Sequence, residues 1–246
     1  MILHPFLAEF VGTAILLLLG AGVVSNVNLK KTIASDQTPW LLTTSAWGFA
    51  VFAGVFISSQ SSGAHLNPAV TLGFAFAGKF SWSLVPTYFA AQLLGAMLGS
   101  WLSYIVYIDH HRVTSDEEAV RSTFCTGPAI RNFKNNFFSE AVGTFVLVFG
   151  ALFIVSPNIN IVGSEVENFG LGALDALPIG ILVWVIGIAL GGTTGYAINP
   201  ARDFGPRLVY QLLPRKNKDA DWAYSWIPIL GPFTGGAIAG LIYTIL

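Results

Sequence analysis

Long stretches without a charged residue are the feature that most limits how this chain can fold. No Asp, Glu, Lys or Arg occurs between Asp36 and Lys79, between Lys79 and Asp109, or after Asp221. Charged residues make up 10% of the chain, against roughly 25% in an ordinary soluble domain. Because about 20 apolar residues cross the hydrocarbon core of a bilayer, these stretches are typical of membrane spans. The first stretch is about twice that length, so we expect it to hold one span and a second segment that enters the membrane without crossing it.

Hydropathy predicts an all-α, multi-pass membrane protein with six transmembrane helices. The expected spans are residues 6–24, 41–59, 84–107, 139–155, 176–192 and 224–245, with polar loops at 25–39, 108–136 and 156–175. No linker suggests a second domain, so residues 1–246 are expected to form a single transmembrane channel domain. We expect it to lie in the cell membrane.

The two halves of the chain repeat one another. AEFVGT at residues 8–13 recurs as SEAVGT at 139–144, GAHLNPA at 63–69 recurs as GYAINPA at 195–201, and QLLG at 92–95 corresponds to PFTG at 232–235. We place the repeats at about residues 5–107 and 137–246. Each repeat holds three spans, an odd number, so the second repeat must be inverted relative to the first. A 3+3 inverted repeat places its functional site near the bilayer midplane, where the halves meet.

An Asn-Pro-Ala triplet opens a short apolar stretch in each repeat. The triplets are Asn67, Pro68, Ala69 and Asn199, Pro200, Ala201. Asn is a favoured helix N-cap, and Pro is suited to the first helical position. The stretches run about 12 residues, to Gly78 and Leu213, and so reach about half-way across the membrane. We therefore predict two re-entrant half-helices whose N-termini meet at the membrane centre.

This meeting point is suited to neutral solutes. The side-chain amides of Asn67 and Asn199 can donate hydrogen bonds to a passing oxygen, while the two positive helix ends oppose a cation. Irregular backbone at membrane depth is tolerated only where it lines a wet cavity or is covered by protein. We therefore expect a ladder of acceptor carbonyls before the two triplets, from Gly63, Ala64, His65, Gly195, Tyr196 and Ala197.

Residues 62–71 and 199–207 resemble the aquaporin superfamily (major intrinsic proteins), and within it the glycerol uptake facilitators, or aquaglyceroporins. The resemblance covers nearly the whole chain. It implies six tilted helices plus two half-helices, and a homotetramer in the lipid bilayer with one pore in each subunit. It also implies passive passage of glycerol, related small neutral solutes and water, without a cofactor. Asp203 followed by Arg207 is similar to the pattern that marks glycerol channels.

The same resemblance implies a narrow outer filter made by Trp47, Gly187, Tyr196 and Arg202. Two aromatic faces can hold a carbon chain while the Arg202 guanidinium donates to hydroxyls. Water-selective relatives have His in place of Gly187, so the glycine is expected to leave room for a larger solute. Tyr196 departs from the phenylalanine usual in glycerol facilitators. Its hydroxyl either favours compact polar solutes, such as hydrogen peroxide, urea or a protonated hydroxy acid, or points away from the lumen to a loop carbonyl.

Two carboxylates, Glu9 and Glu140, lie inside predicted spans. A proton relay is one interpretation. Their symmetric placement favours another, in which each accepts hydrogen bonds from the backbone before its own half-helix. For His65 we favour a fixed packing role over titration in the pore. Asp109, His110 and His111 are of metal-ligand types, but adjacent loop residues do not converge, so we expect a solvated loop edge and no metal site.

Other functions fit the sequence less well. The few basic residues make no patch interleaved with aromatics, which argues against nucleic-acid binding. No Ser/His, paired-aspartate or His-Glu-x-x-His arrangement lies within the spans, so we do not expect an enzyme. A coupled secondary transporter also has inverted repeats but needs an ion site at the midplane, where this chain has neutral asparagines. A water-selective aquaporin is the nearer alternative, disfavoured by Gly187 and Asp203.

Overall fold

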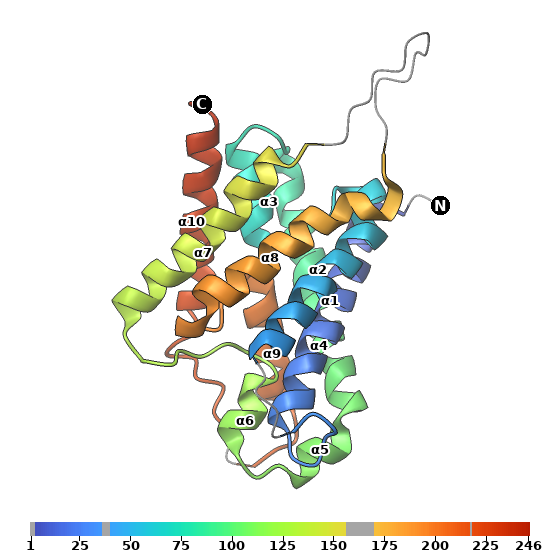
Figure 1. The fold of residues 1–246 in the computed structure, drawn as a ribbon, viewed down its shortest axis with the longest axis vertical. Coiled ribbons are helices and arrows are strands. Elements are labelled where there is room, and N and C mark those ends of the chain that lie inside the picture. Colours follow the sequence, from blue (N-terminus) through green and yellow to red (C-terminus); the bar gives the residue numbers. More distant parts are fainter. Residues whose placement is uncertain (1–2, 36–39, 156–169, 217) are drawn as a thin grey trace.

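The computed structural model describes residues 3–35, 40–155, 170–216 and 218–246, and these residues form helices and no strand. The long helices are α1 (Pro5–Asn28), α2 (Trp40–Ser62), α4 (Val85–Val106), α7 (Phe133–Phe153), α8 (Leu177–Leu190) and α10 (Ile227–Tyr243). Short 3-10 turns are η1 (Trp82–Leu84), η2 (Gly172–Ala176) and η3 (Gly191–Thr193). The long helices lie side by side, and both termini lie at one end of the molecule, which we call the terminal end (Figure 1).

Among the described residues, five helical segments are long and apolar enough to cross a membrane: Pro5–Asn28, Trp40–Ser62, Trp82–Val106, Phe133–Phe153 and Gly172–Thr193. Each overlaps a predicted span. The sixth predicted span contains α10, which is also apolar but has only 17 residues. A turn from Tyr224 to Ile227 precedes it and adds length at its start. Residues 36–39 and 156–169 of the predicted loops lie outside the described residues.

The two predicted half-helices are α3 (Pro68–Phe76) and α9 (Pro200–Leu212). Each begins directly after an asparagine whose Oδ1 caps it, accepting from the backbone N of Ala69 at 2.8 Å and of Ala201 at 3.0 Å. At 1.5 Å per residue the two helices are about 14 and 20 Å long, well short of a hydrocarbon core of about 30 Å. Both are therefore re-entrant by length.

Each half-helix packs against the last long helix of the other half. Helix α3 contacts α10, and α9 contacts α4. A Cβ added to Gly240 of α10 would lie only 2.2 Å from the carbonyl oxygen of Gly73 in α3, so this crossing requires a glycine. Within the halves, α1 packs on α4 and α7 packs on α10. Each repeat thus contributes a half-helix that packs against a long helix of the other repeat.

The segment predicted as a polar loop at residues 108–136 contains two further helices. Helix α5 (Ile108–Val113) and helix α6 (Glu117–Ser122) lie at the end of the molecule opposite the termini, the α5–α6 end (Figure 1). Asp116 caps α6, and Asn132 caps α7, which therefore starts before the predicted span. Side-chain caps, and not apolar content, set these helix starts.

The expectation of a solvated loop edge is wrong for His111. Asp109 is exposed and pairs with Arg112 at 2.9 Å, but the His111 ring is buried, with centroids 5.0 Å from Tyr104 and 5.7 Å from Phe124. Burial lowers the pKa of the His111 imidazole to about 4. This histidine is therefore an uncharged part of the packing at the α5–α6 end.

Candidate functional site

The segments before the two half-helices share an unusual backbone. Left-handed φ angles occur at equivalent positions: 80°, 53° and 53° at Gly63, Ala64 and Leu66, and 76°, 36° and 40° at Gly195, Tyr196 and Ile198. For residues other than glycine such conformations cost about 1–3 kcal/mol each and persist only where the surroundings impose them. A buried carboxylate does so in each half.

Glu9 binds the first of these backbone segments. Its Oε1 accepts the backbone N–H of His65 at 2.9 Å, and its Oε2 accepts that of Leu66 at 2.7 Å. The Ser62 hydroxyl and the Gln92 amide donate to the same carboxylate at 2.7 and 2.8 Å. The backbone hydrogen bonds expected for Glu9 are therefore present.

Glu140 binds the second backbone segment in the same way. Its carboxylate accepts the backbone N–H groups of Ala197 at 2.9 Å and Ile198 at 2.8 Å. The hydroxyl of Thr194 donates to it at 2.6 Å. Both carboxylates are buried, so each supplies the acceptors that the irregular backbone would otherwise lack.

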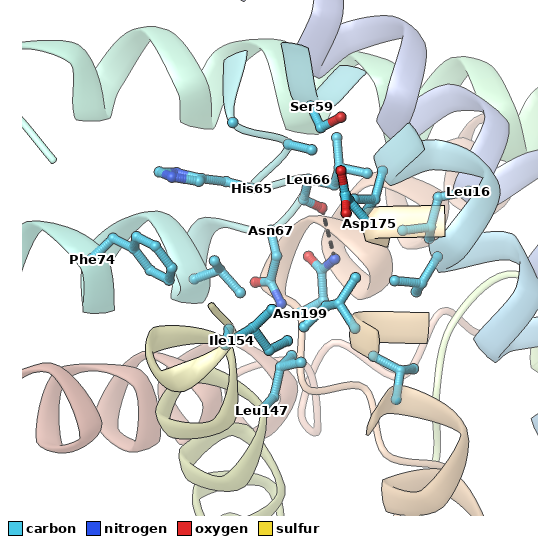
Figure 2. Close-up of a pocket in the computed structure, with 18 residues that line it drawn as sticks. Leu16, Ser59, His65, Leu66, Asn67, Phe74, Leu147, Ile154, Asp175 and Asn199 are labelled. Atoms are coloured by element: carbon cyan, nitrogen blue, oxygen red, sulfur yellow. Dashed lines mark hydrogen bonds between the residues drawn. The ribbon is translucent and has the colours of Figure 1, made fainter. Parts of the chain in front are cut away.

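The two asparagines join the halves where α3 and α9 begin. The Asn67 amide donates to the carbonyl of Ile198 at 2.7 Å, and the Asn199 amide donates to the carbonyl of Leu66 at 2.9 Å, as Figure 2 shows for the second bond. An amide NH₂ group has two donors. One N–H of each asparagine is thus used between the halves, and among the described residues the other has no protein acceptor.

Two cavities meet at these asparagines. The larger, of about 250 Å³, is lined by residues 63–66, and the smaller, of about 40 Å³, by residues 195–198. Both are bounded by Asn67 and Asn199 and by an aliphatic wall of Leu16, Val51, Leu147 and Val183. The two cavities therefore share two amide and four aliphatic lining residues.

Three of the four expected filter residues, Trp47, Tyr196 and Arg202, line the smaller cavity. The Arg202 guanidinium lies 4.1 Å from the centroid of the Trp47 ring. Its Nη1 donates to the carbonyl of Phe124 at 3.3 Å. The remaining guanidinium donors can face a solute hydroxyl.

Gly187 does not line this cavity. A Cβ added to it would lie 2.7 Å from Cζ of Tyr196 and 3.0 Å from Cγ2 of Thr44, and one added to Gly191 would lie 2.3 Å from Cδ1 of Tyr196. The tyrosine ring is seated on these two glycines, with Trp40 edge-on at 5.9 Å. The glycine thus makes room for the Tyr196 ring, not directly for a solute as the sequence led us to expect.

His65 is packed among aromatic rings. Its centroid lies 5.1 Å from Phe74, 4.7 Å from Phe80 and 5.2 Å from Tyr88. Its Nδ1 lies 3.1 Å from the Thr71 hydroxyl. These contacts agree with the packing role favoured for it.

Comparison with known proteins identifies the family. Residues 1–243 match the family described as Major intrinsic protein. The chain belongs to the major intrinsic protein family. It is 49% identical to "Glycerol uptake facilitator protein 3" of Lactiplantibacillus plantarum, over 98% of this chain and 95% of the relative. It is 47% identical to the "Probable glycerol uptake facilitator protein" of Thermotoga maritima, over 97% of each chain.

A solved major intrinsic protein shares the fold. The aquaglyceroporin from Plasmodium falciparum superposes with a TM-score of 0.80 at 33% identity, covering 98% of this chain and 94% of that one. The fold class predicted from the sequence is therefore confirmed.

A buried ion pair lies next to Arg202 in helix α9 of this major intrinsic protein. Asp203 Oδ1 accepts from Arg207 Nε at 2.8 Å, and Oδ2 from Arg207 Nη2 at 3.0 Å. Asp203 also accepts from the backbone N–H and the hydroxyl of Thr126, both at 2.8 Å. Thr126 follows shortly after Phe124, whose carbonyl accepts from Arg202, so the ion pair and Arg202 bind the same loop.

Several residues of the site were not predicted from sequence. Gln92 bridges Glu9 and Thr71, Thr194 binds Glu140, and Thr126 binds Asp203. Gln92 lies in a repeated segment but aligns with a proline in the second half, so the repeat carried no signal for it. Gly191, four residues after Gly187 and so on the same helical face, was the available signal for the seat of the Tyr196 ring.

The Tyr196 hydroxyl is buried and has no hydrogen-bond partner among the described residues. It is found neither at the lumen surface nor on a loop carbonyl, the two alternatives drawn from the sequence.

An unpaired buried hydroxyl is unfavourable, so we expect Tyr196→Phe to raise the free energy of unfolding by about 1 kcal/mol. The ratio of glycerol to hydrogen peroxide permeability should not change. Thermal melting measures the stability, and vesicle flux measures the permeability ratio. Tyr196→Leu is the control that removes the ring as well as the hydroxyl. A lower melting temperature or an altered permeability ratio for Tyr196→Phe would contradict the expectation.

Proposed function

We propose that the protein is a passive channel for glycerol, related small neutral solutes and water. The observation that carries the proposal is the mixed lining of the two cavities. The backbone segments 63–66 and 195–198 and the amides of Asn67 and Asn199 supply polar groups, and Leu16, Val51, Leu147 and Val183 supply apolar ones. A polyol has hydroxyls along one edge and a carbon chain along the other, so this lining matches it. The glycerol uptake facilitators among its relatives support the same solute.

Exclusion of protons and other cations follows from charge in the same path. The N-termini of α3 and α9 meet at the cross-bonded asparagines, and each carries about half a positive charge from its dipole. Arg202 adds a full positive charge at the smaller cavity. A cation would meet repulsion at two successive levels, while a neutral hydroxyl meets donors.

The proposal extends to finer points. The backbone carbonyls before the two half-helices would serve as acceptors, and Trp47, Tyr196 and Arg202 would form the filter. Gly187 would leave room for the Tyr196 ring. We further propose a homotetramer with one pore per subunit in the cell membrane. Hydrogen peroxide, urea and protonated hydroxy acids are additional candidate solutes because they are small and neutral. A water-selective channel is the alternative.

Flux through purified protein in vesicles tests the function. We expect light-scattering assays to give glycerol permeability well above that of empty vesicles. A proton or sodium gradient should drive no accumulation of glycerol, and a pH dye should report no added proton leak. Water flux without glycerol flux would favour the water-selective alternative, and gradient-driven accumulation would indicate a coupled transporter.

A pair of variants locates the path. Leu147 lines both cavities, whereas Leu230 is 50% exposed on the outer surface of the helices. Leu147→Trp should block glycerol by filling the lumen, and Leu230→Trp should leave the flux unchanged. Equal flux in the two variants would place the path elsewhere.

A further inference from the structure

One carboxylate stands at the mouth of the larger cavity. Asp175 belongs to η2, just before α8, at the terminal end of the molecule, where the α8 ribbon begins in gold (Figure 1). Its side chain is exposed and lines the cavity together with Ser59, Gly63 and Leu66 (Figure 2). Of the described residues that line this cavity, Asp175 is the one with a fixed formal charge at neutral pH. An anion that enters the cavity beside η2 would meet this charge.

The position of this carboxylate is constrained by the turn that carries it. Asp175 Oδ1 accepts the backbone N–H of Leu171 at 3.2 Å. The neighbouring Ala176 is buried at the start of α8. One hydrogen bond therefore ties the exposed carboxylate to its own turn at the cavity lining.

The centre of the path has the opposite sign. Two helix N-termini and Arg202 border the cavities, whereas the carboxylates of Glu9 and Glu140 do not line them. The lumen therefore opposes cations but attracts anions. Glycerate, for example, differs from glycerol by a carboxylate in place of one CH₂OH group, and its charge would be drawn toward Asn67 and Asn199. Neutral selectivity therefore needs a second, negative element on the route to the centre.

We propose that Asp175 is a specificity-determining residue that keeps small organic anions out of the terminal-end mouth while neutral polyols enter. The proposal rests on the passive-channel function argued above. A unit charge about 6 Å from an entering anion lowers its occupancy roughly threefold even in bulk water, and more between low-dielectric walls. The effect is local, since charges beyond about 10 Å are screened at 0.1 M salt.

The test measures whether an anion blocks glycerol. Glycerol flux into vesicles is recorded at pH 7.5 and low ionic strength, with and without glycerate on both sides of the membrane. For the unmodified protein we expect little inhibition. For Asp175→Asn, which keeps the shape and removes the charge, we expect at least threefold stronger inhibition, because glycerate reaches the electropositive centre and occupies it. Inhibition is expressed for each protein relative to its own glycerol flux without glycerate, so that a change in basal flux does not enter the comparison.

Two further variants make the result decisive. Asp175→Glu keeps the charge and should restore resistance to glycerate. Asp109→Asn removes an exposed charge, with 83% of its side chain accessible, at the α5–α6 end, and should behave like the unmodified protein. Equal glycerate inhibition in Asp175→Asn and the unmodified protein, or the same change in Asp109→Asn, would overturn the proposal. Absence of any glycerol flux in the unmodified protein would instead contradict the proposed channel function.

Discussion

Asp203→Asn is expected to lower the free energy of unfolding by about 3–5 kcal/mol, because it leaves the Arg207 charge buried without its partner. Both side chains are fully buried, and the carboxylate binds the guanidinium through two nitrogens. Arg207 also donates to backbone carbonyls of Thr126, Ala220 and Asp221. The arginine therefore cannot move into solvent without releasing two loops, and the amide that replaces the carboxylate offers it no charge.

The controls for this variant come from the same chain. Asp109 and Arg112 form a pair at 2.9 Å with side chains 83% and 68% exposed, and exposed pairs contribute about 0–1 kcal/mol. Asp109→Asn should therefore melt close to the unmodified protein. The double change Asp203→Leu with Arg207→Met should be less harmful than Asp203→Asn, since it removes both buried charges. Melting of Asp203→Asn at the same temperature as Asp109→Asn would show that the ion pair does not hold the loops.

Gly187→Ala is expected to cut glycerol permeability tenfold or more while water permeability falls less. The new Cβ would overlap the Tyr196 ring at 2.7 Å. The ring is seated on Gly187 and Gly191 of one helix face, with Trp40 edge-on at 5.9 Å, so a methyl group at position 187 pushes it away from that face. It must shift toward Arg202 and Trp47, across a cavity of only about 40 Å³. A narrowed lumen excludes glycerol before it excludes water. Gly187→His should have the same effect to a greater degree.

Stopped-flow measurement of the two permeabilities checks this expectation. Adding Tyr196→Ala to Gly187→Ala should restore glycerol flux, because the displaced ring is gone. Gly22→Ala is the matched control, since a Cβ at Gly22 would meet no atom within 4 Å. Equal loss of water and glycerol, without rescue by the double variant, would indicate misfolding and not a narrowed filter.

Polar anchoring could be predicted from the sequence where each repeat offered one solution. A carboxylate in an apolar span, next to irregular backbone with unpaired N–H groups, has few other partners. Glu9 and Glu140 each bind the backbone segment before the half-helix of their own repeat. The two half-helices were predictable for a similar reason. Asn at the N-cap followed by Pro at the first helical position is a local start signal that can be read directly from the sequence.

Features that depend on facing surfaces could not be predicted in the same way. Whether Gly187 faces the lumen or the Tyr196 ring depends on how α8 is rotated relative to the backbone segment that carries Tyr196. A local sequence pattern does not determine this rotation. Helices α5 and α6 escaped a hydropathy search because they are short and polar, although the cap at Asp116 was visible. The partners of Arg207 come from residues 126 and 220–221, which lie far apart in the sequence.

The exchange of amide and carbonyl between Asn67 and Ile198, and between Asn199 and Leu66, also bears on how the protein is made. When the first repeat leaves the ribosome, the carbonyl of Leu66 and the amide of Asn67 have partners that are still about 130 residues from being synthesised. In the lipid core an unpaired polar group is costly, so α3 cannot reach its final depth until the second repeat arrives. Insertion should therefore be completed late and in one cooperative step, as expected for contacts of long sequence separation. A chain truncated before Asn199 would then be a substrate for quality control and not a half-channel.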